Sequence, residues 1–193
     1  MHRRTWLALV IVPLLLQGCG YNRIQELDER AQQTKQNISV QLQRRADLVP
    51  NLVETVRGYA AHEEEVFTNV AQARAALSGA VQGGDVGQMA AADARLNGAL
   101  GRLIAIAEAY PQLRADQQFT RLMDELAGTE NRIAVARQDY NEAVSQYNTY
   151  IRRFPTTLTA RAIGAEQRDY FEVQDESVRT APSVDFSKEP ATP

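Results

Sequence analysis

Residues 117–154, QQFTRLMDELAGTENRIAVARQDYNEAVSQYNTYIRRF, decide the fold of this 193-residue chain. Apolar side chains recur here every three or four residues, which places them along one face of a helix. These side chains belong to Phe119, Leu122, Leu126, Ile133, Ala136, Tyr140, Val144, Tyr147 and Ile151. Asp116 is a suitable N-cap, and Pro155 ends the helix because a residue that precedes proline avoids the helical conformation. The pattern predicts a helix of roughly 45 Å or more.

Similar apolar stripes run through three earlier segments, at about 21–48, 49–77 and 85–109. Proline is nearly absent between Pro50 and Pro155, and good helix formers dominate there. The glycine-rich segment 78–87 predicts a loop between two antiparallel helices. A repeat near 3.5 residues favours left-handed, coiled-coil-like packing. The sequence therefore predicts an all-α fold, an elongated antiparallel bundle of about four long helices with a kink or break near Pro50.

The expected break at Pro50 lies in the most unusual polar segment of the chain. A proline inside a helix removes one backbone hydrogen bond and clashes with the preceding turn. Arg44, Arg45, Asp47 and Asn51 surround it, and such side chains can satisfy the backbone groups that a helix break exposes. We interpret this cluster as structural first, with a ligand or interaction site as the alternative.

The N-terminus has the features of a bacterial lipoprotein signal. Two arginines precede a short apolar run at residues 5–16, which is too short to span a bilayer that needs about 20 apolar residues. The run ends in Leu-Gln-Gly-Cys, which matches a lipobox at Cys19, the only cysteine. We expect residues 1–18 to be removed and Cys19 to carry acyl chains that anchor the protein in a membrane. Because residue 20 is not aspartate, analogy with bacterial lipoproteins favours the outer membrane, facing the periplasm, where the cell has one. A spare cysteine in an ordinary signal peptide is the alternative.

The predicted mature chain is acidic and of single-domain size. Two of the 21 basic residues leave with the signal, so 19 basic residues face 24 acidic ones, for a net charge of −5. Without a clustered basic run, nucleic acid is not expected as a partner. The bundle is expected to occupy residues 19–172, including a short helix within 159–170. Residues 173–193, which hold proline, serine and acidic residues, are expected to be a disordered tail.

No catalytic, metal or cofactor motif emerges from the sequence. His62 would need a second histidine four residues later for a zinc-protease helix, and that position is Val66. The glycines near residue 84 lack phosphate-loop spacing, and acidic residues such as Asp93, Asp124 and Glu125 show no calcium-loop pattern. We therefore expect no enzyme activity, no metal and no cofactor.

Three Tyr-Asn pairs recur, at 21–22, 140–141 and 147–148, the last two separated by one heptad. They predict either hydrogen bonds between helices that fix the register, or a surface for a partner.

Several of these segments resemble the LemA family. The resemblance lies in residues 41–63, 108–119 and 129–155, together with Gly164 before Phe171, and covers about residues 21–172. It implies a membrane-tethered, extracytoplasmic helical bundle with no established biochemical activity and no catalytic residues to transfer. The family's strongest motif falls on Arg44, Arg45, Asp47, Pro50 and Asn51. Many members begin with a transmembrane helix, so the lipobox is a departure in the mode of anchoring.

Together these features lead us to expect a lipid-anchored scaffold or adaptor for other proteins of the cell envelope. Two alternatives remain open. One is an enzyme or an enzyme regulator, such as a partner of an envelope protease, in which the polar cluster from Arg45 to Asn51 forms a site with His62. The other is a bundle that assembles with copies of itself into a homo-oligomer.

Overall fold

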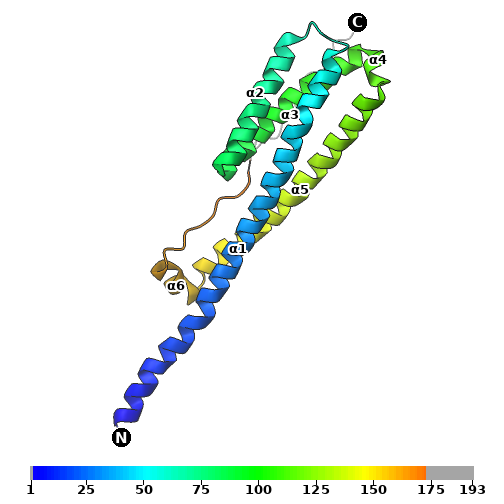
Figure 1. Cartoon of the computed structure of the whole chain (residues 1–193). Helices are drawn as coiled ribbons and strands as arrows, with labels where there is room; N and C mark the ends of the chain where they lie inside the picture. Colours follow the sequence, from blue (N-terminus) through cyan, green and yellow to red (C-terminus); the bar gives the residue numbers. More distant parts are fainter. Residues whose placement is uncertain (1, 173–193) are drawn as a thin grey trace, which may run out of the picture.

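The computed structural model describes residues 2–172, with side chains from Gly20 onward. Its elements are α1 (His2–Arg57), α2 (Glu64–Gly83), α3 (Val86–Ala109), α4 (Pro111–Arg114), α5 (Gln117–Arg152) and α6 (Thr156–Ala162) (Figure 1). No strand occurs among these residues, and the predicted all-α bundle is confirmed. The side chain of Cys19 and the expected tail at 173–193 lie outside the described part of the chain.

The bundle is a rod of uneven thickness (Figure 1). The helices α1 and α5 run antiparallel along its length, whereas α2 and α3 cover only one half and α6 lies at the other end. We call the end with the α1–α2 and α4–α5 connections the tip, and the end with Gly20 and α6 the base. A continuous apolar core includes Leu42, Leu52, Phe67, Leu96 and Ile133, and a smaller one at the base includes Ile24, Tyr147 and Ile151.

The expected break at Pro50 is wrong, because α1 continues through this residue to Arg57. Proline cannot donate to the carbonyl four residues earlier, which belongs to Ala46. The Nε of Arg74, on α2, donates to that carbonyl oxygen at 2.9 Å instead. Pro50 itself is exposed. A neighbouring helix thus supplies the donor that proline lacks, and the helix persists.

This substitution of donors predicts an energetic coupling between Arg74 and Pro50. Arg74→Ala should lower the free energy of unfolding by about 1.5 kcal/mol, because it leaves the Ala46 carbonyl without a donor. In a Pro50→Ala background the backbone N–H of residue 50 satisfies that carbonyl, so the cost of Arg74→Ala should fall to about half or less. Urea unfolding of the four variants in this double-mutant cycle measures the coupling. Arg95→Ala, at an exposed arginine on α3, is the control. Equal costs of Arg74→Ala in both backgrounds would contradict the compensation.

The actual interruption between α1 and α2 falls at residues 58–63, at the tip. The N–H groups of Tyr59 and Ala60 both donate to the Val56 carbonyl and close the end of α1. The Tyr59 hydroxyl donates to Asp116 Oδ2 at 2.9 Å, which ties this connection to the start of α5. His62 lies here, exposed to solvent.

The connection between α2 and α3 is a tight turn, shorter than the loop expected at 78–87. The helix α2 extends to Gly83, and Gly84 adopts a left-handed conformation (φ 72°) while its N–H donates to the Ala80 carbonyl. Asp85 then caps α3 by accepting from the Gln88 N–H at 2.7 Å. Glycine permits this conformation without steric cost, so a single residue reverses the chain and sets α2 antiparallel to α3.

The predicted N-cap of the long C-terminal helix is confirmed. Asp116 Oδ1 accepts from the N–H groups of Gln118 and Phe119 at 2.7 and 3.0 Å. These bonds, first of all the one from Phe119, lower the pKa of the Asp116 carboxyl, and the bond from Tyr59 acts in the same direction.

The chain reverses direction after α6. This helix begins at Thr156 and ends at Ala162, earlier than expected. Gly164 (φ 69°) follows, with the Ala165 N–H donating to the Ala160 carbonyl and the Gly164 N–H donating to the Arg161 carbonyl. This is a Schellman motif. It directs residues 165–172, which we call the strap, back along the rod in a non-helical conformation (Figure 1).

Candidate functional site

The predicted polar cluster around Pro50 is divided between two environments. Arg45 is buried, with 5% of its surface exposed, whereas Arg44, Asp47, Pro50 and Asn51 are exposed. The carboxylate of Asp47 accepts from Gln43 one turn earlier, at 2.8 Å. Because α1 is unbroken, these side chains do not cap a helix break as expected.

Arg45 belongs to a charge cluster inside the bundle, formed by residues from α1, α3 and α5. Asp93 has no exposed surface; its Oδ1 accepts from Arg45 at 2.9 Å and its Oδ2 accepts from Arg137. Arg45 also bonds to the side-chain oxygen of Asn97 and lies 2.5 Å from a carboxylate oxygen of Glu130. Three helices thus meet at a single buried carboxylate.

The charges in this cluster balance, since two guanidinium groups face two carboxylates. Removing charges from water is costly unless each finds a partner, and each group here has at least one. Arg137 additionally places its guanidinium 5.1 Å from the centre of the Phe171 ring. Both oxygens of Asp93 are occupied, and the residue is closed to solvent. The geometry therefore suits a structural centre that fixes the register of three helices, rather than acid–base chemistry on a substrate.

Sequence reasoning missed Asp93, although the sequence contains a signal for it. Asp93 lies between Met89 and Leu96 at spacings of four and three, which is a core position of the α3 stripe. Arg45 lies in the same way between Leu42 and Val49 on α1. Two opposite charges at core positions of different stripes indicate a buried pair.

The two Tyr-Asn pairs on α5 bind the strap. Neither of the roles predicted for them, hydrogen bonds between helices or a surface for a partner, includes this contact. The side-chain amide of Asn148 donates to the Arg168 carbonyl and accepts from the Arg168 N–H, both at 2.9 Å. Asn141 bonds in the same manner to Phe171, at 3.3 and 2.8 Å. Seven residues of helix and three residues of extended chain both span about 10 Å. The heptad spacing therefore matches every third residue of the strap.

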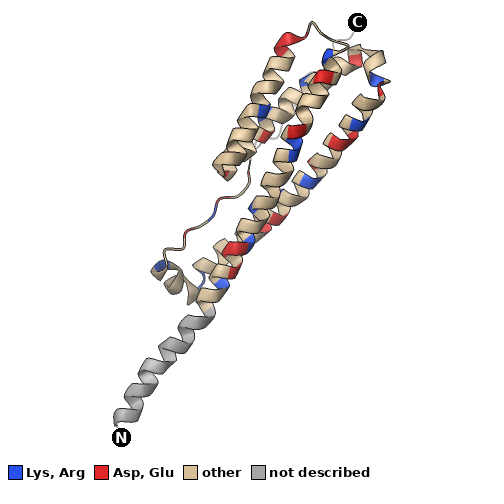
Figure 2. Cartoon of the chain, viewed as in Figure 1, with Lys and Arg blue, Asp and Glu red and all other residues tan. Residues whose placement is uncertain are grey.

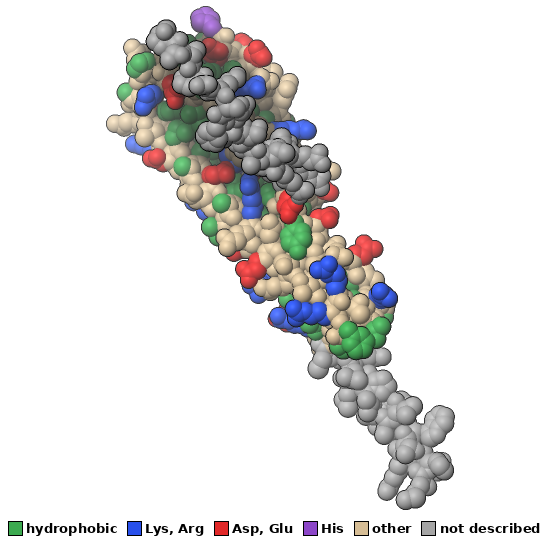
Figure 3. Space-filling view, turned by 180° about the vertical axis from the view of Figure 1, so that it is seen from behind, with side chains coloured by type: hydrophobic (Ala, Val, Ile, Leu, Met, Phe, Trp, Pro, Cys, Tyr) green, Lys and Arg blue, Asp and Glu red, His purple; other side chains and the backbone are tan. Residues whose placement is uncertain are grey.

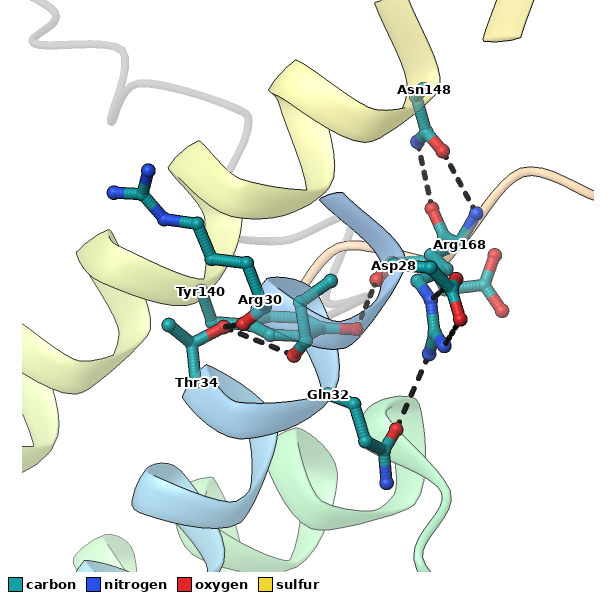
Figure 4. A network of polar contacts seen from close by, with 9 residues as sticks. Asp28, Arg30, Gln32, Thr34, Tyr140, Asn148 and Arg168 are labelled. Atoms are coloured by element: carbon teal, nitrogen blue, oxygen red, sulfur yellow. Dashed lines mark hydrogen bonds and ion pairs between the residues drawn. The ribbon is translucent and has the colours of Figure 1, made fainter. Parts of the chain in front are cut away.

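The tyrosines of these pairs and Arg168 complete the attachment (Figure 4). The Tyr140 hydroxyl donates to the Asp169 carbonyl at 2.8 Å. Arg168 forms two bonds with the carboxylate of Asp28 on α1, at 2.7 and 3.0 Å, and its guanidinium lies 5.9 Å from the centre of the Tyr147 ring. The bond to Asp28 raises the pKa of Arg168, and burial raises the pKa of both tyrosines. We call the contacts of Arg168 and Phe171 with Asp28, Asn141 and Asn148 the clasp.

Other sequence candidates stay apart from these two clusters. Tyr21 is exposed and does not belong to the smaller apolar core at the base. In the described part of the chain, no group of histidine, cysteine, aspartate and glutamate side chains is arranged to hold a metal ion. None of the described helices combines the length and the apolar character that crossing a membrane requires.

The fold and its two polar clusters define a class of protein: a rod-shaped, all-α bundle whose buried charges bind one another. The chain belongs to the LemA family, whose model matches residues 34–186. It is similar to the magnetosome proteins MamQ 1 and MamQ 2 of Paramagnetospirillum magneticum, each 30% identical over 175 residues. It is also similar to the magnetosome protein MamQ of Magnetospirillum gryphiswaldense, 29% identical over 174 residues. These alignments cover 78–79% of this chain and 64% of each relative, so the chain spans just under two thirds of their length.

Proposed function

We propose that this protein is a lipid-anchored, non-catalytic scaffold or adaptor in a bacterial cell envelope. In this proposal Cys19 carries the lipid, in the outer membrane facing the periplasm where the cell has one. The rod presents its outer surface to other envelope proteins. The relatives named above carry the name of a cell structure, the magnetosome, rather than of a reaction, which agrees with a role in organisation.

The observation that carries the proposal is the continuity of α1 between Gly20 and Arg57. At 1.5 Å per residue, this part of the helix measures about 55 Å. An anchor at Cys19 would join it directly, without a flexible linker. The length of the helix would then fix the distance from the anchor to the tip, which is useful for positioning a partner and has no evident use in a soluble catalyst.

A linker insertion tests the proposed positioning. In a strain that lacks the gene and shows an envelope defect, a flexible ten-residue Gly-Ser linker between Cys19 and Gly20 should impair complementation while palmitate labelling of Cys19 persists. The distance from anchor to tip is then no longer fixed. The same linker after residue 172 is the matched control and should complement. Normal function of both insertions would contradict the scaffold.

A second set of variants separates the scaffold from the enzyme alternative. Cys19→Ala behind a cleavable signal that carries no lipobox should be impaired, and His62→Ala should complement normally. Full activity of the unanchored chain, together with complete loss in a folded His62→Ala variant, would favour the enzyme.

Photo-crosslinking separates the scaffold from self-assembly. Val135, on α5, is 59% exposed and is a suitable position for the crosslinking residue. A heterologous envelope protein is the product expected of a scaffold, whereas crosslinks only to a second copy would support the homo-oligomer.

A further inference from the structure

Large apolar side chains are exposed at the base of the rod. Phe154 is 81% exposed, Leu158 59%, Tyr21 45% and Ile163 38%. These are four of the eight large apolar residues that are exposed in the described part of the chain. In the space-filling view an apolar patch lies at this end, beside basic side chains (Figure 3). Exposed apolar clusters of this kind mark surfaces of interaction.

The segment around α6 at this end carries only positive charges, although the chain as a whole is acidic. Residues 149–165 contain Arg152, Arg153 and Arg161 and no aspartate or glutamate. Figure 2 shows a basic position and no acidic one on α6, whose one charged residue is Arg161. Arg153 and Arg161 form no side-chain hydrogen bond or ion pair with any residue that the structure describes. These two guanidinium groups are therefore available to an anionic partner.

The contacts of Gly20 place this surface next to the point where the chain would enter the membrane. Gly20 is buried, and a Cβ atom at this position would lie 3.3 Å from Thr156 Cγ2 and 3.6 Å from Thr159 Oγ1. Thus α6 packs against the residue that directly follows Cys19. Any anchor at Cys19 brings α6 to the bilayer surface.

We propose that the base of the rod binds the surface of a membrane that contains anionic lipids. Phe154 and Leu158 enter the interfacial region, while Arg152, Arg153 and Arg161 contact the negatively charged headgroups. Apolar side chains surrounded by arginines bind such interfaces by combining burial with electrostatic attraction. The inference rests on the proposed function only for the position of the anchor. The surface would hold the rod upright, which one lipid attachment point alone does not achieve.

Vesicle binding without the lipid anchor tests this proposal. The processed chain with Cys19→Ala should co-sediment with vesicles of equal parts phosphatidylglycerol and phosphatidylcholine, more weakly as the salt concentration rises. The double variant Phe154→Ser and Leu158→Ser should bind at least about tenfold more weakly. Arg153→Ala with Arg161→Ala should cause a similar loss and reduce the dependence on salt.

The rod also provides a matched control for this experiment. Val40 and Val135 are 61% and 59% exposed. They lie on α1 and α5 between the base and the tip, a part of the rod that we call the shaft, away from α6. The double variant Val40→Ser and Val135→Ser should bind like the parent, and all variants should melt at similar temperatures. Equal loss in shaft and base variants, or no binding by the parent, would overturn the proposal. Equal binding to pure phosphatidylcholine vesicles would overturn the contact with headgroups. Palmitate labelling and complementation test the anchor separately, so failure here is distinguishable from failure of the scaffold.

Discussion

Asp93→Ala is expected to lower the free energy of unfolding by about 3–5 kcal/mol, the largest effect of any single substitution considered for this protein. The substitution removes the carboxylate that binds both Arg45 and Arg137, and it leaves the buried guanidinium of Arg45 close to the partly exposed one of Arg137. Arg45 retains Glu130, so the loss is not that of a completely isolated charge. Asp93→Asn, which preserves shape but not charge, should show an intermediate loss. Urea unfolding followed by circular dichroism measures both.

Two further variants show whether charge is the cause. Asp124→Ala, at an exposed aspartate on α5, should change stability by less than about 0.5 kcal/mol. The combination of Arg45→Met, Asp93→Leu and Arg137→Met should recover most of the lost stability, because apolar groups of similar volume replace three of the four charges and the fourth, Glu130, is partly exposed to water. If the triple variant were no more stable than Asp93→Ala, the loss would come from packing and not from unpaired charge.

Asn148→Ala should cost about 2–3 kcal/mol, because it breaks two hydrogen bonds and leaves the backbone groups of Arg168 without partners. Loss of the clasp also weakens the ion pair between Arg168 and Asp28. The strap should then detach locally, so trypsin should cleave after Arg168 faster than in the parent. Urea unfolding measures the global effect, and the cleavage rate at Arg168 measures the local one.

The control for this variant is Asn131→Ala, an exposed asparagine on the same helix. It should leave both stability and cleavage unchanged. Asn141→Ala removes the second half of the clasp and should act in the same direction as Asn148→Ala. An unchanged cleavage rate in Asn148→Ala would contradict the assigned role of the Tyr-Asn pairs.

Features that depend on local periodicity could be predicted from the sequence. The α5 stripe and its N-cap at Asp116 follow from residues within a few positions of one another. The continuity of α1 through Pro50 could not be predicted, because the donor that compensates for proline is Arg74, on another helix. The rule that proline kinks or breaks a helix describes an isolated helix, and here a contact with another helix overrides it.

The site was harder to predict because its chemistry is shared among helices. Arg45 was identified from the sequence as part of a polar cluster, but its partner Asp93 lies 48 positions further along the chain, and Arg137, which also binds Asp93, lies 92 positions further. The strap escaped prediction for a different reason. It has little apolar content and no helical period, so its order depends on residues far away in the sequence: the side-chain amides of Asn141 and Asn148 bind its backbone, and Asp28 binds Arg168.

The clasp also has a consequence for the order in which the protein assembles. Asp28 and Arg168 are 140 positions apart, the greatest separation among the side-chain hydrogen bonds described. Contacts of long sequence separation form late, because the chain between them must first become compact. The contact between α1, the first helix to be synthesised, and the strap therefore forms only after the strap has been synthesised. In kinetic terms, the base of the rod is expected to close last, and in a truncated chain that lacks residues 165–172 the base would stay open.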